Sequence, residues 1–289
     1  MAFVINTNVA SLTAQRSLNN STSALSTTFK RLSSGLRVNS AADDAAGLSV
    51  SDRMTAQIRG FNQSVRNAND TISLIQVAEG ALDQTTAALQ RIRELAVTAA
   101  NDTYIATDRA DMQKEIDQLL TEVNRIANNT QFNGQVLLAG SFVNKKFHVG
   151  ANSGQVITFN IGSMTTSALN SINVMLTGGE SALTGQTIDG SLNANQTAAE
   201  AAITRIDGAI AKVTTQRANL GAMQNRFDAV IANLSNVSVN TANARSRITD
   251  ADMASETAKL TQNSIMQQAG IAVLSQANQQ PAAVLQLLK

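Results

Sequence analysis

The chain has 289 residues, with no Cys, no Trp, one Pro and one His, and its 22 basic and 21 acidic side chains leave a formal net charge of +1. The lack of Cys excludes disulfides, thiolate metal sites and a Cys nucleophile, and one His cannot build a His-rich metal site. The near-zero charge argues against a protein that wraps nucleic acid, and no apolar run is long enough for a transmembrane helix.

The composition favours helices. Hydrophobic residues make up 43% of the chain but aromatic residues only 3%, and aromatic side chains bury the most area each. A single proline, Pro281, leaves nearly the whole chain free to be helical. We therefore expect a mainly α protein whose long, coiled-coil-like helices pack along narrow seams, with a small β-hairpin region.

The first 36 residues are expected to form an amphipathic helix. Its apolar positions are Ile5, Val9, Leu12, Leu18, Leu25, Phe29, Leu32 and Leu36. No partner helix lies nearby in the sequence, and an isolated helix of this kind is marginal in water. The start of the chain also lacks the basic region and apolar stretch of a secretory signal.

Residues 44–99 predict one long helix. Its apolar residues recur at steps of four and three and then seven, which is the heptad spacing of coiled-coil-like packing. They are Met54, Ile58, Phe61, Val65, Ala68, Ile72, Ile75, Leu82, Leu89 and Ala96. Gly60 and Gly80 interrupt this helix and should weaken it locally.

A second helix is expected after a short polar break at residues 101–104, so the two helices should lie antiparallel. Thr107 is its expected N-cap, with Asp108 and Asp111 in the first turn, where carboxylates favour the helix dipole. Its seam consists of Met112, Ile116, Leu119, Val123 and Ile126.

The middle of the chain changes character. Asn133-Gly134 is a turn signal, and alternating apolar residues predict a β-hairpin near residues 142–162. Residues 163–195 are rich in Ser, Thr, Gly and Asn and predict no definite element. A third long helix follows, with the seam Ile203, Ile206, Ile210, Val213, Leu220, Phe227, Ile231 and Leu234. It should pair with the helix at 44–99, because the two seams are similar in length.

The chain ends with a further amphipathic helix over residues 248–289. Its apolar positions include Met253, Leu260, Ile265, Leu274, Leu285 and Leu288. The two end helices can pair with each other or with other copies of the chain. We favour burial between copies, because two helices alone make too thin a core to hide both faces.

No catalytic or cofactor motif is found: HExxH, GxxxxGK[ST], GxGxxG and GxSxG are all missing. Asp43 and Asp44 are expected to be helix N-terminal charges in a sharp connection, since consecutive residues point in different directions. His148 is expected to be a surface or packing residue. The cluster of Lys30, Arg31 and Arg37 favours local or intersubunit ion pairs over a nucleic-acid site. We therefore expect neither enzymatic activity nor a bound cofactor or metal.

Several segments resemble bacterial flagellin, the subunit of the flagellar filament. They are residues 1–10 (MAFVINTNVA), 31–49 (RLSSGLRVNSAADDAAGLS), 90–97 (QRIRELAV), 130–134 (TQFNG) and the region from 269 to 288. The resemblance covers about residues 1–162 and 196–289. It implies an inner domain built from both chain ends and a helical domain built from the long helices and the hairpin.

On this resemblance, residues 1–40 and 250–289 would form the inner, polymer-core domain. Residues 41–249 would form the helical domain, with a β-hairpin region at about 130–190 and no large outer domain. The resemblance implies polymer-core packing by Ile5, Val9, Leu12, Leu18, Leu25, Leu32, Leu260, Ile265, Leu274, Leu285 and Leu288. The connection with Arg31, Gly35, Asp43, Asp44 and Gly47 would be a hinge between the domains.

The resemblance also implies partners. The chain would polymerise with itself outside the cell after export by the flagellar type III apparatus, without a cleaved secretory signal. A flagellar export chaperone would bind 250–289, and filament cap and junction proteins would flank the polymer. Arg91, Leu95 and Glu115 match the residue types that an animal Toll-like receptor contacts in this family, and they would also pack between neighbouring protofilaments.

Two alternatives to a filament subunit stay open at this stage. A hook–filament junction protein has similar ends, although residues 31–49 and 91–97 favour flagellin. A secreted enzyme or effector is the other alternative, but the chain offers no zinc motif and no insert large enough for a protease domain.

Overall fold

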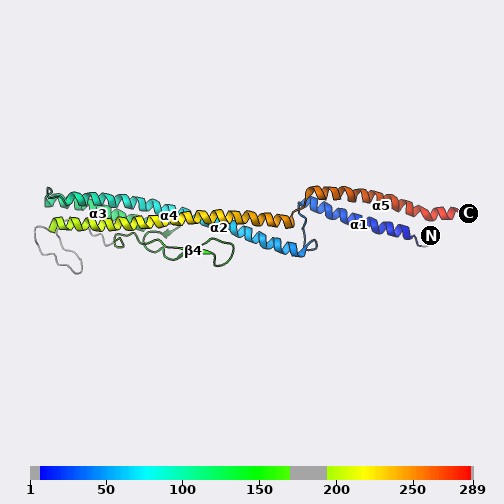
Figure 1. Cartoon of the computed structure of the whole chain (residues 1–289), viewed down its shortest axis with the longest axis horizontal. Helices are drawn as coiled ribbons and strands as arrows, with labels where there is room; N and C mark the ends of the chain where they lie inside the picture. Colours follow the sequence, from blue (N-terminus) through cyan, green and yellow to red (C-terminus); the bar gives the residue numbers. More distant parts are fainter. Residues whose placement is uncertain (1–6, 170–193, 288–289) are drawn as a thin grey trace. The chain divides into compact units, whose positions relative to one another are not determined.

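The computed structural model describes residues 7–169 and 194–287 (Figure 1). These residues form α1 (Val9–Ser34), α2 (Ala45–Ala99), α3 (Ala106–Asn129), β1 (Gln131–Phe132), β2 (Gln135–Val136), β3 (Lys145–His148), β4 (Val156–Phe159), α4 (Ala194–Thr249) and α5 (Met253–Leu287). The predicted mainly α class is confirmed. The predictions for Ile5, for the side chains of Leu285 and Leu288, and for most of the segment 163–195 lie outside the described residues.

The chain divides into two compact units. The first consists of Met1–Arg59 and Ser238–Lys289, and the second of Gly60–Val237. The domain boundaries expected at about 40 and 250 coincide with the breaks between α1 and α2 and between α4 and α5, whereas the two units divide further along, inside α2 and α4. Both long helices therefore begin or end within the first unit and run on into the second.

The core of the second unit lies along α2 and α4. Leu82 and Leu89 of α2 and Val213, Leu220 and Phe227 of α4 are fully buried in one hydrophobic cluster. Surface ion pairs also join the two helices: Arg93 to Asp207 at 2.6 Å, and Arg217 to Asp83 at 3.1 Å. The predicted pairing of the two long seams is confirmed, and the order of these partners makes it antiparallel.

The third helix begins two residues earlier than expected. Thr107 lies inside α3, so the predicted N-cap is wrong. Asp108, at the third helical position, accepts a hydrogen bond from the backbone N–H of Ile105 at 3.2 Å instead. A carboxylate that reaches back in this way satisfies a donor that precedes the helix, and the Thr107 hydroxyl is not needed.

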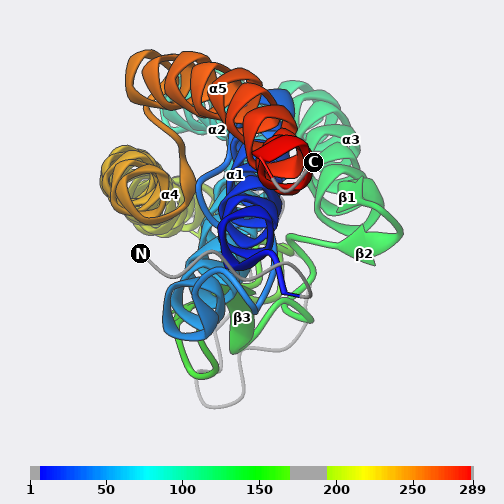
Figure 2. The same cartoon turned by 90° about the vertical axis from the view of Figure 1, so that its right-hand side faces the viewer.

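Two small hairpins follow α3, and the sequence predicted the turn of the first and the whole of the second. In Figure 2, β1 and β2 lie directly after the end of α3. Asn133 and Gly134 connect them with φ of 48° and 76°, and two positive φ values define the expected tight turn. The second hairpin pairs β3 with β4.

Several of the chain's few aromatic side chains lie in or beside the second hairpin. Phe142 contacts Phe147 and Phe159 at ring centroid distances of 6.3 Å, and Phe147 contacts Phe227 of α4 at 6.2 Å. These rings attach the hairpin to a helix more than sixty residues further along the chain. His148 is exposed on β3, as expected.

Gly60 of α2 allows the turn between β3 and β4 to pack closely against the helix. A Cβ on Gly60 would lie 2.9 Å from the Cβ of Ala151, which is too close for two carbon atoms. One turn further along α2, the Ser64 hydroxyl donates to the Gly150 carbonyl at 2.8 Å. Gly60 therefore weakens the helix but allows the turn to pack on it.

Candidate assembly interface

Helices α1 and α5 of the first unit pair with each other, as Figures 1 and 2 both show. The side chains buried between them are small or polar, namely Ser11, Ala14, Thr28, Glu256 and Ala277. A helix seam usually buries branched aliphatic residues. This seam therefore differs from those of α2 and α4.

Polar contacts run along the whole seam. At one end, the Asn8 amide donates to the Ala277 carbonyl and the Ser11 hydroxyl to the Asn278 amide oxygen, both at 2.7 Å. Further along, the amides of Gln267 and Asn263 donate to the hydroxyls of Thr22 and Thr28, both at 3.4 Å. The partners advance on α1 as they recede on α5, so the helices are antiparallel.

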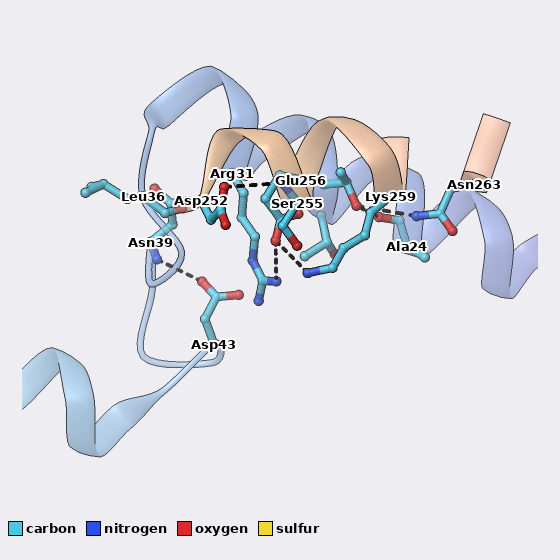
Figure 3. A network of polar contacts seen from close by, with 12 residues as sticks. Ala24, Arg31, Leu36, Asn39, Asp43, Asp252, Ser255, Glu256, Lys259 and Asn263 are labelled. Carbon is cyan, nitrogen blue, oxygen red and sulfur yellow. Dashed lines mark hydrogen bonds and ion pairs between the residues drawn. The ribbon is translucent and has the colours of Figure 1, made fainter. Parts of the chain in front are cut away.

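An ion pair closes the other end of the seam (Figure 3). Glu256 of α5 is 4% exposed. Its carboxylate lies 3.6 Å from the Arg31 guanidinium of α1 and 2.9 Å from Lys259, one turn along α5. A buried carboxylate is tolerated only when cations or donors compensate it. The sequence predicted local or intersubunit ion pairs for Arg31, and the structure pairs it with Glu256 of the same chain.

The two breaks in the first unit are hydrogen-bonded to each other. Arg37 N–H donates to the Thr249 carbonyl at 2.7 Å, and Ala251 N–H donates to the Gly35 carbonyl at 2.9 Å. The Arg37 guanidinium donates to the Ile248 carbonyl at 2.6 Å. Gly35 ends α1 with a φ of 70°, a left-handed conformation that suits a residue without a side chain. The connection after α1 is thus fixed to the connection before α5.

Asp43 and Asp44 organise the entry into α2, as expected. Asp43 accepts from the N–H of Asn39, at 3.1 Å, and from the N–H and hydroxyl of Ser40, both at 2.9 Å. These bonds, the Ser40 hydroxyl foremost, lower the pKa of the Asp43 carboxyl below its usual value. Asp44 accepts from Gly47 N–H at 2.8 Å and so caps α2. A hinge role for this connection stays a prediction.

The surface of the terminal pair that faces away from the seam, its outer face, carries many exposed apolar side chains. Large hydrophobic side chains that are about half exposed or more are Val9, Leu12 and Phe29 of α1 and Met253, Ile265, Met266, Ile271 and Val273 of α5. A groove of about 580 Å³ lies between the helices and is lined by residues such as Ala10, Ala14, Met266 and Val273. Leu18, Leu25, Leu32, Leu260 and Leu274 are only half-buried. Among the predicted polymer-core residues, Val9, Leu12 and Ile265 therefore lie on this face.

The predicted receptor surface lies in the second unit, where the structure brings two of its three residues together. Arg91 of α2 is paired with Glu115 of α3 at 2.9 Å and with Glu94 at 3.1 Å, and all three side chains are exposed. These hydrogen bonds, that of Glu115 foremost, raise the pKa of Arg91. Leu95 is 7% exposed and belongs to the core. Its side chain therefore adds little to that surface.

Sequence reasoning missed two buried charged residues. Besides Glu256, Arg109 of α3 is 8% exposed, and its guanidinium donates to the carbonyls of Ala99 and Asn101 at 2.8 and 3.2 Å. It therefore satisfies carbonyl groups at the end of α2. The available signal was that Arg109 is next to the apolar seam position Met112 on a helical wheel. Glu256 offered a similar signal, four residues before Leu260.

The described parts of the chain contain no cluster of His, Cys, Asp and Glu that could bind a metal. They also contain no helix that is long and apolar enough to span a membrane. Fold and interface thus define a helical protein whose two ends pair and present an apolar face. The model of the bacterial flagellin N-terminal helical region matches residues 5–143, and that of the C-terminal helical region matches residues 203–288.

Curated relatives match along the whole chain. A flagellin of Halalkalibacterium halodurans is 44% identical over 286 residues, which cover 99% of this chain and 100% of the relative. The flagellar filament 33 kDa core protein of Treponema phagedenis is 44% identical over 296 residues, with the same coverage. A flagellin of Bacillus subtilis is 43% identical over 303 residues and 99% of both chains.

Among solved structures, a putative flagellar hook-associated protein from Vibrio parahaemolyticus has a TM-score of 0.53 at 17% identity, covering 72% of this chain and 100% of that one. That similarity shows a shared fold. The chain belongs to the flagellin family. It is a structural subunit of the bacterial flagellar filament. The filament assembles from copies of this subunit and serves motility.

Proposed function

We propose that the paired terminal helices form the core of the filament and that their apolar outer face is buried between copies of the chain. The observation that carries this proposal is the exposure of Phe29 (62%), Val9 (60%) and Ile265 (59%) on one pair of helices. Soluble proteins rarely expose many large apolar side chains together unless a partner covers them. In the second unit, by contrast, the seams of α2 and α4 are closed within the chain.

The mechanical role follows from this arrangement. Burial between copies would stiffen the polymer, and a filament turned by a basal motor would transmit thrust without any catalytic step. Arg91 and Glu115, with Leu95 beneath them, would lie at a contact between neighbouring protofilaments. An animal Toll-like receptor would use the same surface.

The route to the filament is part of the proposal. The chain would leave the cell through the flagellar export apparatus without a cleaved signal and function extracellularly, between junction proteins and a cap. Before export, α5 would be covered by a flagellar chaperone. Ile265, Met266, Ile271 and Val273 offer the exposed apolar side chains that a helix-binding groove recognises.

Two variants test the burial of the outer face. Phe29→Ser combined with Ile265→Ser removes apolar area without touching the inner seam. The matched control, Asn19→Ser with Gln262→Ser, changes exposed polar residues of the same two helices. Sedimentation of seeded filaments should show a strongly raised critical concentration for the first variant only. Equal critical concentrations for the two variants would refute the proposal.

A truncation tests the same claim more coarsely. Removal of residues 250–289 deletes α5 and leaves the second unit intact. The truncated chain should be soluble, helical by circular dichroism and unable to polymerise. Long filaments of this truncated chain in electron micrographs would contradict a core built from the terminal pair.

A further inference from the structure

We infer that the polar contacts between α1 and α5 set the register of the terminal pair, while its hydrophobic residues serve contacts between copies. The residues that specify the register are Ser11, Thr22, Thr28 and Arg31 of α1 with Asn278, Gln267, Asn263 and Glu256 of α5. The inference deepens the proposed function, since it rests on the terminal pair being the polymer core.

The hydrophobic residues cannot fix the register by themselves. Leu18, Leu25 and Leu32 recur every seven residues along α1, and Leu260 and Leu274 are separated by twice that interval on α5. A slip by seven residues therefore brings one leucine of α1 to the place of another. These leucines are also only half-buried in the native register, so a slip alters little apolar burial.

The charged contact has no such repeat. After a slip by seven residues in one direction, Glu256 would face Ala24 in place of Arg31. After a slip in the other direction, it would face Val38, beyond the end of α1 at Ser34. Both slips separate a buried carboxylate from its cation on α1 and leave it with Lys259 of its own helix, which is unfavourable. A single buried polar residue is known to fix register in coiled coils in the same way.

Register matters because a helical polymer repeats one contact between identical copies. A slip by seven residues moves α5 along α1 by roughly 10 Å. It would displace Ile265 and Met266 from Phe29 and Val9 by that distance and change the apolar face offered to the next copy. A polar inner seam thus gives every copy the same outer face.

Crosslinking can measure the register, because the chain has no Cys of its own. The pair Thr22→Cys and Gln267→Cys gives up one register contact but keeps the Arg31–Glu256 pair, and it reports the native register because these two positions touch. The pairs Gln15→Cys with Gln267→Cys and Phe29→Cys with Gln267→Cys report the two slipped registers. A short bis-maleimide is added, and products with the mass of a single chain are quantified in both soluble and sedimented fractions.

The test compares two backgrounds. With Arg31 and Glu256 present, only the native pair should crosslink. With Arg31→Leu and Glu256→Leu together, the ratio of native to slipped crosslinks should fall by about a hundredfold, because the penalty on slipping is removed. The matched control, Asp52→Leu with Arg53→Leu, removes an acid and a base from the exposed surface of α2 and should keep the native ratio.

An unchanged ratio in the Leu/Leu background would overturn the inference. Loss of all three crosslinks would also overturn it, because the ion pair would then provide the pairing itself. Arg31→Glu with Glu256→Arg should restore the native crosslink. Filament yield is scored on the same samples. Slipped crosslinks confined to the soluble fraction support the inference and slipped crosslinks within filaments contradict it, whereas native crosslinks in chains that never polymerise count against the proposed function alone.

Discussion

Arg109 offers the sharpest test of the packing between α2 and α3. Arg109→Met keeps most of the aliphatic stem but removes the guanidinium, which donates to Ala99 and Asn101 and lies 3.7 Å from Asp102. The carbonyl groups at the end of α2 then lose two charge-assisted bonds. At roughly 1.5–3 kcal/mol for each such bond, with partial replacement by water, the free energy of unfolding should fall by about 2–4 kcal/mol.

A local probe is available for this change. The chain has one Tyr and no Trp, and Tyr104 lies in the connection between α2 and α3. Tyrosine fluorescence during urea unfolding therefore reports on this corner. The control is Arg125→Met on the same helix, where the exposed Arg125 pairs with Glu122 one turn away. Its effect should stay within about 0.5 kcal/mol. Equal midpoints for the two variants would show that the buried guanidinium does not hold the corner.

Three further results are expected. Gly60→Ala should lower the melting temperature by displacing the turn at Ala151, whereas Gly80→Ala, which has open space around it, should stabilise α2 by about 0.5–1 kcal/mol; a gain in both would refute the contact. The lowered pKa of Asp43 stabilises the fold at pH values above its usual value of 3.8, and this contribution is lost as the pH falls through the lower, folded value. Asp43→Asn should therefore melt earlier than the parent chain at pH 7, and the gap should narrow as the pH is lowered below 3.8; a constant gap in circular dichroism melts would contradict this. Leu89→Ala should destabilise the second unit by about 2–5 kcal/mol in urea unfolding, and an unchanged midpoint would argue against the α2–α4 core.

The sequence was sufficient to predict the elements whose apolar residues recur at regular intervals. The heptad spacing predicted α2 and α4 and their pairing, and Asn133-Gly134 predicted the first hairpin turn. These signals are local in the sequence, so they can be recognised without knowledge of the tertiary contacts. The N-cap of α3 was missed because Asp108 accepts the N–H of Ile105, which lets the helix begin before Thr107.

The interface was harder to predict, because a helical period says which side chains share a face but not which face is inside. Leu18, Leu25 and Leu32 have the strongest heptad spacing on α1, yet they are only half-buried. The buried positions belong to Ser11 and Thr28. The buried state of Glu256 depends on Arg31, more than two hundred residues away. Leu95 was placed on a surface by residue type, whereas packing places it in the core.

The central claim is that copies of the chain cover the apolar outer face of the terminal pair. The most direct measurement compares maleimide labelling of Phe29→Cys and Ile265→Cys in the soluble chain and in sedimented filaments. Both sites are highly exposed in the single chain, and no other Cys competes. The account predicts rapid labelling of the soluble chain and strong protection of both sites in filaments. Equal labelling rates in the two states would contradict it.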